Sequence, residues 1–147
     1  MGAITGREPA TIVVFEVEGR KRRTIDPGGP VRGMVHAHGH LVANLFGRGV
    51  SIWAASGELV RTFEPYDCAV RALAVTERWL VMIPDRPPRE ATLDVWSRDT
   101  FECRASVAIP GGFAPDWVVA SPDGRLLLTR ELPVRGEFGI RTWHLDA

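Results

Sequence analysis

The sequence predicts an all-β fold built from antiparallel four-stranded sheets, each formed by about 40 residues. Short apolar runs end in an aromatic residue four times, at residues 11–15, 50–53, 92–96 and 139–143. Between these runs, segments of the form apolar strand, polar turn, apolar strand recur and indicate β-hairpins. No segment between the strands has the 3.6-residue apolar period of an amphipathic helix. The chain is therefore predicted to be a repeat protein made of β-strands.

The aromatic residues that end these runs set the spacing of the repeat. Phe15, Trp53, Trp96 and Trp143 lie 38, 43 and 47 residues apart. Large aromatic side chains at equivalent places in successive sheets are expected to fill the space between neighbouring sheets. We therefore predict that these four residues have a structural role and hold no cofactor.

A hairpin unit lies between successive aromatic runs. In its last copy, Asp123 and Gly124 supply the positive φ that a tight turn needs. Each repeat is predicted to have strands a and b on either side of the turn, strand c ending at the aromatic residue, and strand d after it. The three copies of the hairpin are MVHAHGHLVAN, LAVTERWLVMI and VVASPDGRLLLT, at residues 34–44, 73–83 and 118–129.

Four antiparallel strands repeated every 40 to 45 residues are typical of a β-propeller blade. On the segments SPDGRLLLT (121–129) and VSIWAASGELVRTF (50–63), the chain resembles WD40-type propeller repeats, over essentially its whole length. Three of its repeat tryptophans are followed by Ala54, Ser97 and His144, where that family has Asp. The resemblance implies that partners bind the face formed by the loops from strand d to strand a and from strand b to strand c.

The repeats predict one partial, unclosed WD40-like propeller over residues 1–147. It comprises an incomplete blade at about 10–25, blades at about 31–66 and 70–108, and an incomplete blade at about 116–147. This is about three and a half blades, whereas closed propellers have about four to eight. Unpaired edges and uncovered apolar faces promote association. The ring is expected to be completed by self-association, by a partner chain, or by further blades of a longer protein.

Composition limits the classes of partner. Eighteen Lys and Arg residues balance eighteen Asp and Glu residues, so no overall field attracts nucleic acid or anionic membrane. No apolar stretch approaches the length of a membrane span, and we expect a cytoplasmic protein. Its two cysteines, Cys68 and Cys103, are expected to be reduced. Cys103 aligns with Val60 inside a strand and is predicted to be a small buried hydrophobic residue.

Three histidines alternate in VHAHGHLV (35–42), which raises the question of a metal site. If the loop is Ala37-His38-Gly39, His36 and His40 flank it and their imidazoles can meet. If it is the two-residue turn His38-Gly39, they point to opposite faces. Zinc also needs further ligands held in tetrahedral geometry, and no Cys or second His cluster has suitable spacing nearby. A solvated polar turn is therefore predicted, without metal or cofactor.

No enzyme motif is present in the sequence. The two PGG segments, at 27–29 and 110–112, lack the Lys and Ser or Thr of a phosphate-binding P-loop. The predicted function is that of a noncatalytic protein-protein interaction or scaffold module. One alternative is a part of an enzyme or small-ligand-binding propeller whose active-site groups lie on missing blades. Another is a gene fragment without independent function.

The candidate partner-binding residues lie in the loops from strand d to strand a and from strand b to strand c. Arginine and aromatic side chains are enriched among residues that dominate binding energy at protein interfaces. The candidates of these two residue types are Arg32, Tyr66, Arg71, Arg86, Arg89, Phe113, Trp117, Arg135 and Phe138.

Overall fold

The computed structural model describes residues 11–15, 22–47, 49–111, 115–131 and 139–145. In these residues, consecutive strands of the same sheet pair with each other, and every pairing is antiparallel. The strands are β1 (Ile12–Phe15), β2 (Arg22–Ile25), β3 (Val31–Ala37), β4 (His40–Leu45), β5 (Gly49–Ala54), β6 (Leu59–Phe63), β7 (Val70–Val75), β8 (Trp79–Pro84), β9 (Thr92–Ser97), β10 (Cys103–Ala108), β11 (Trp117–Ala120), β12 (Leu126–Glu131) and β13 (Gly139–His144).

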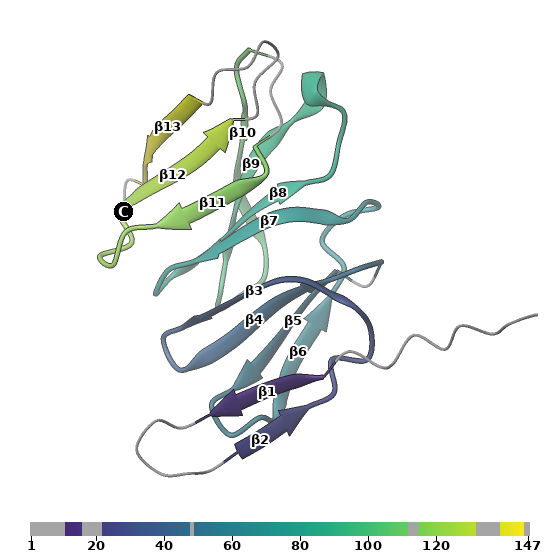
Figure 1. Cartoon of the computed structure of the whole chain (residues 1–147). Coiled ribbons are helices and arrows are strands. Elements are labelled where there is room, and N and C mark those ends of the chain that lie inside the picture. The colour runs from purple at the N-terminus through teal and green to yellow at the C-terminus, as the bar shows by residue number, and fades with distance from the viewer. Residues whose placement is uncertain (1–10, 16–21, 48, 112–114, 132–138, 146–147) are drawn as a thin grey trace, which may run out of the picture.

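The described strands form four sheets that follow one another along the chain. The first sheet is β1-β2, the second β3-β4-β5-β6, the third β7-β8-β9-β10 and the fourth β11-β12-β13. Figure 1 shows them stacked from the first sheet at the bottom to the fourth at the top, with no contact between the two end sheets. This confirms the predicted all-β fold of antiparallel four-stranded sheets in an unclosed arrangement.

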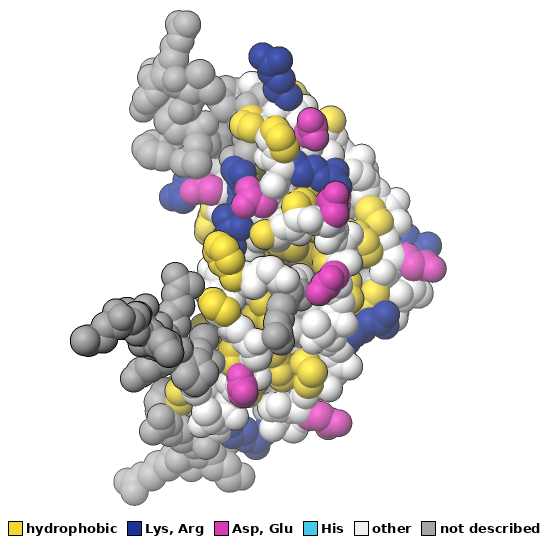
Figure 2. Space-filling model, turned by 90° about the vertical axis from the view of Figure 1, so that its right-hand side faces the viewer, with side chains coloured by type: hydrophobic (Ala, Val, Ile, Leu, Met, Phe, Trp, Pro, Cys, Tyr) yellow, Lys and Arg dark blue, Asp and Glu magenta, His cyan; other side chains and the backbone are white. Residues whose placement is uncertain are grey.

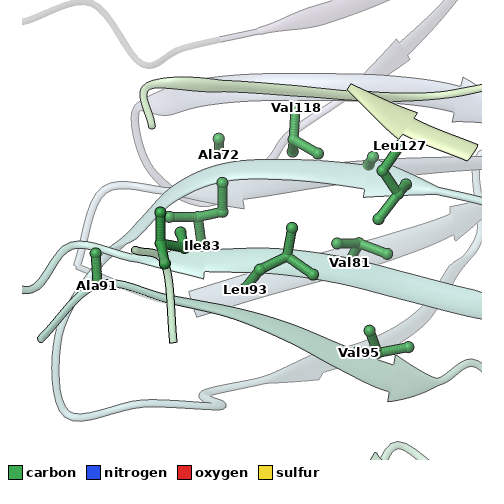
Figure 3. Packing of buried hydrophobic residues seen from close by; sticks show 10 residues of the cluster. Ala72, Val81, Ile83, Ala91, Leu93, Val95, Val118 and Leu127 are labelled. Carbon is green, nitrogen blue, oxygen red and sulfur yellow. The ribbon is translucent and has the colours of Figure 1, made fainter. Parts of the chain in front are cut away.

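Apolar clusters hold neighbouring sheets together. Val42 and Val50 of the second sheet pack with Leu80 and Met82 of the third, and each is 1% exposed. The next cluster joins the third and fourth sheets in the same way, as Figure 3 shows from close by; its members are Ala72, Ala74, Val81, Ile83, Ala91, Leu93, Val95, Ile109, Val118 and Leu127. Each inner sheet is therefore buried on both faces, which explains why its middle strands are continuous apolar runs.

Strand d is the outermost strand of each complete sheet. In β6, four of the five side chains are exposed, and in β10 all six are exposed. The prediction that Cys103 is buried was wrong, because Cys103 begins β10 and is exposed. Its alignment with Val60 places both residues on strand d, and Val60 is itself 53% exposed. Cys103 lies within a strand, but this strand is on the surface and outside the apolar core.

The loop after β8 contains a single turn of 3-10 helix, η1 (Pro88–Glu90), which the sequence analysis did not anticipate. Pro88 opens this turn and suits it, because proline fixes φ near the helical value and its missing N–H is not needed there. No helix among the described residues is long and apolar enough to cross a membrane.

Leu127 tests whether contacts between sheets stabilise the fold. Its side chain is 0% exposed and packs between the third and fourth sheets. We expect Leu127→Ala to lower the free energy of unfolding by about 2–5 kcal/mol, because it leaves a cavity. Leu59→Ala is the control, since Leu59 is 54% exposed on β6, and it should change stability by less than about 0.5 kcal/mol. Urea unfolding measures both, and equal losses would contradict this account of the core.

Substitutions at two glycines distinguish the cost of a steric clash from the cost of a positive φ. Gly39 and Gly49 both have positive φ, 73° and 72°, but only Gly49 lies against the backbone of β6. A Cβ at residue 49 would lie 2.3 Å from the carbonyl oxygen of Phe63, whereas nothing lies within 4 Å of one at residue 39. Gly39→Ala should cost about 1–2 kcal/mol from φ alone, and Gly49→Ala clearly more. Comparable losses in urea unfolding would show that the close approach at Gly49 is unimportant.

Candidate functional site

The innermost strands β3, β7 and β11 begin at the same end of the molecule, which we call the arginine-rich end and define by Arg32, Arg71, Asp85, Asp116 and Trp117. Arg32 and Arg71 sit at register irregularities at the beginning of β3 and β7. Figure 2 views the molecule from this end and shows basic and acidic side chains intermingled with hydrophobic ones. The arginine-rich end therefore carries both positive and negative charges among apolar groups, and neither sign of charge covers it.

Asp85 connects the second and third sheets by accepting hydrogen bonds from two arginines. Arg32 Nη1 donates to Asp85 Oδ2 over 3.0 Å, and Arg71 Nε donates to Asp85 Oδ1 over 3.0 Å, with Arg71 Nη2 close to the same oxygen. The hydrogen bonds from Arg71 are the main reason that the pKa of Asp85 lies below its usual range, and Arg32 contributes while partial burial opposes. The carboxylate is thus ionised at neutral pH and orients both guanidinium groups.

A second ion pair lies in the fourth sheet. Arg130 donates from Nε to Asp116 Oδ1 over 3.0 Å and from Nη2 to Oδ2 over 2.7 Å, which is a bidentate arrangement. These hydrogen bonds lower the pKa of Asp116, and the charge of Arg71 adds a smaller lowering. Arg71 of the third sheet therefore lies near enough to Asp116 to affect its pKa slightly.

A hollow of about 270 Å³ lies among the innermost strands at this end. Two large apolar side chains line it and remain open to solvent, Met34 at 56% and Trp117 at 44% exposure. The full lining is Arg32, Gly33, Met34, Val35, Asn44, Arg71, Ala72, Leu73, Asp116, Trp117 and Val118. The hollow therefore combines an apolar wall with charged groups that are already held in place.

Asn44 contributes an unused hydrogen-bond acceptor to this hollow. Its side chain is 2% exposed, and its Nδ2 donates to the carbonyl oxygen of Val70 over 2.8 Å. Its Oδ1 is buried and has no hydrogen-bond partner among the described residues. A Cβ at Gly33 would lie 2.9 Å from this oxygen, so a larger residue there would require the asparagine side chain to shift. A buried acceptor without a partner costs free energy.

Tyr66 is partly buried. Its hydroxyl accepts a hydrogen bond of 3.0 Å from Trp96 Nε1, and the two ring centroids are 5.8 Å apart. The guanidinium of Arg86 lies 5.6 Å from the centroid of the Tyr66 ring. Burial, with Asp94 adding to it, raises the pKa of Tyr66 well above its ordinary value. Tyr66 is thus a neutral side chain whose hydroxyl accepts from Trp96 and whose ring contacts the guanidinium of Arg86.

The structure brings Arg32, Arg71 and Trp117 together at the hollow. Arg86 and Tyr66 form a separate contact, and Arg89 is exposed in η1. Phe113, Arg135 and Phe138 lie outside the described residues. Sequence reasoning missed Asn44, Asp85, Asp116 and Met34. The equivalent positions of Arg32 and Arg71 in the repeat indicated that an acidic side chain in the adjoining loops pairs with them.

The three tryptophans that end a strand c lie between sheets. Trp53 is 3% exposed and packs between the first and second sheets. Trp96 packs against the cluster of the second and third sheets, and Trp143 against that of the third and fourth. Trp143 Nε1 donates to Thr129 Oγ1 over 3.0 Å. For Phe15 only the backbone is described, as part of β1.

The histidine segment lies at the opposite end of the innermost strands. Its turn is the two-residue form, because Ala37 pairs with His40 and both His38 and Gly39 have positive φ, 51° and 73°. His36 and His40 consequently point to opposite faces of the sheet. Arg98 Nη2 lies 3.1 Å from His40 Nδ1, which joins the second and third sheets there. Among the described residues, no group of three or more His, Cys, Asp or Glu side chains is placed to hold a metal ion.

Comparison with known proteins assigns the fold. No protein-family model matches the sequence, and no curated protein matches it significantly. The crystal structure of the computationally designed Ika4 protein, a β-propeller, superposes with a TM-score of 0.67 over 92% of this chain and 80% of that one. The fold is an unclosed β-propeller. With 16% sequence identity, the likeness to Ika4 concerns the fold alone. The four sheets of this propeller are accordingly blades, two of them with fewer than four described strands.

The ion pairs of Asp85 predict a pH dependence of stability. Because its pKa is lowered by folding, this carboxylate stabilises the folded chain fully above its unfolded pKa of about 4, and the contribution is lost as pH falls through the folded pKa. Asp85→Asn should lower the free energy of unfolding at pH 7 by about 1 kcal/mol, since the pair is partly exposed. The difference from wild type should shrink below about pH 4.

Urea unfolding at neutral and acidic pH measures this effect. The difference in free energy of unfolding between wild type and Arg71→Gln should also shrink at acidic pH, because Arg71 is the main cause of the lowered pKa of Asp85. A difference between wild type and Asp85→Asn that stays constant from neutral to acidic pH would contradict the assignment.

Proposed function

We propose that this propeller is a noncatalytic protein-interaction module of WD40-like type, and that it binds a peptide segment of a partner protein at the arginine-rich end. The observation that carries the proposal is the exposure of Trp117 and Met34 in a hollow bordered by Arg32 and Arg71. Tryptophan and arginine are the side chains that most often dominate binding energy in protein interfaces. The WD40-like strand pattern of the sequence supports the same assignment.

The fixed positions of the arginines favour binding. Arg32 and Arg71 share Asp85, so ordering these long side chains is largely complete before a partner arrives. A side chain that must be immobilised on binding costs about 0.5–1.5 kcal/mol. Prior ordering at the arginine-rich end therefore makes more of the contact energy available for affinity.

The chemistry of the hollow indicates what the peptide must present. An apolar side chain would cover Trp117 and Met34, which together expose the largest apolar groups of the hollow. We therefore infer a peptide with an apolar anchor side chain.

The carboxylates of the site support a binding role over an acid-base role. Asp85 and Asp116 both have pKa values lowered by arginine hydrogen bonds. A general acid or base works best when its pKa lies near the operating pH. Carboxylates held ionised by arginines are suited to positioning those arginines.

Selection of random displayed peptides on the full chain tests the proposal. The dissociation constant of an enriched peptide is then measured by isothermal titration for wild type and two alanine variants. Trp117→Ala should raise it about 30-fold, as loss of about 2 kcal/mol at a dominant contact predicts. Val107→Ala is the matched control, because Val107 is 44% exposed like Trp117 but lies on the outer strand β10, and it should leave affinity unchanged. Peptides whose binding is insensitive to Trp117→Ala would refute binding in the hollow.

A further inference from the structure

The fourth sheet has an exposed apolar face that corresponds to a buried face in the second and third sheets. The correspondence follows from strand register, because Trp53, Trp96 and Trp143 pair with a leucine of strand b in each sheet. Counting from these pairs, Leu128 takes the position of Val42 and Val81, and Ile140 that of Val50 and Leu93. Equivalent positions in stacked repeats face the same neighbour.

Exposure differs sharply between these equivalent positions. Val50 is 1% and Leu93 2% exposed, because the following sheet covers them, whereas Ile140 is 74% exposed. Val119 is 37% exposed, while Ala74, its equivalent in the third sheet, is 3% exposed. Within the described residues, no sheet follows the fourth. The repeat therefore indicates that this face of the fourth sheet packs against another sheet, as the equivalent faces of the second and third sheets do.

The first sheet offers the complementary surface. Ile12 and Ile25 are 6% and 4% exposed because they pack against the second sheet. Val13 and Thr24 pair directly in the register of β1 and β2 and alternate with those isoleucines, so they point to the opposite face. This is the side on which a preceding sheet would stack. Two strands suffice for such packing, since β1 and β2 leave Trp53 of the second sheet 3% exposed.

We propose that the Ile140 face of the fourth sheet binds the Val13 and Thr24 face of the first sheet of a second copy of this chain. The contact continues the stacking of sheets from one copy into the next. A head-to-tail contact of this kind forms a closed ring when its rotation allows. Two copies supply eight sheets, which lies within the range of about four to eight blades in closed propellers. The proposal concerns sheet faces and does not depend on peptide binding at the arginine-rich end.

Analytical ultracentrifugation of the full chain tests the proposal through a pair of complementary variants. Wild type should be a dimer, and Ile140→Asp and Thr24→Asp should each raise the dimer dissociation constant about 100-fold or more, since each buries an unpaired charge. Both residues are exposed in the single chain, so both variants should fold. Mixed in equal amounts, they should form a heterodimer, because one of the two junctions then has two unaltered faces.

The control is Val60→Asp, which adds the same charge at a residue that is 53% exposed on the outer strand β6. This variant should remain a dimer. Far-ultraviolet circular dichroism and urea unfolding of all three variants establish that a monomer is folded.

Three results would overturn the proposal. One is a wild-type monomer up to the highest soluble concentration. Another is a Thr24→Asp dimer alongside an Ile140→Asp monomer, which would mean that two fourth sheets pair with each other. The third is a mixture of the two folded variants that remains monomeric. After the first or the third result, partner chains or further blades would be the groups that cover the Ile140 face.

Discussion

Each inner sheet of this protein has two apolar faces, and the rest of the structure depends on covering both of them. In β4, Val42 faces the third sheet while Leu41 and Ala43 face the first, and all three are nearly inaccessible to solvent. A sheet with two such faces cannot leave either in water without losing about 25 cal/mol for each Å² of exposed apolar surface. Stacking in sequence order is the solution that short connections allow.

Stacking also creates the site at the arginine-rich end. The innermost strands of three successive sheets begin side by side, so Arg32, Arg71 and Asp116 approach one another although they are far apart in the sequence. Asp85 then serves two sheets at once. The site is thus a product of the contact between blades, and anything that separates the second and third sheets also separates its charged groups. The proposed peptide binding and the stability of the fold are therefore coupled at this end of the propeller.

Stacking of the sheets leaves the outer strands less restricted in residue type than the middle strands. Strand d contacts only one neighbouring strand of its own sheet, and its side chains face solvent in β6 and β10. Polar, charged and small residues are tolerated there, which accounts for an exposed Cys103 at the position of Val60. The unpaired edges of such strands are usually protected from association by charge. In the fourth sheet, the exposed residues Val119 and Ile140 lie on its edge strands β11 and β13 and share one face of the sheet.

The sequence by itself determined the strands, their order and their antiparallel pairing, because apolar runs, tight-turn residues and a recurring aromatic position are local signals. It also indicated Arg32, Arg71 and Trp117 as equivalent positions at one end. Only the tertiary structure decided the choice of the His38-Gly39 turn, the exposure of strand d, and the sharing of Asp85 between two arginines. These features depend on how sheets lie against one another, and the period of a strand reports which face a residue occupies but not what covers that face.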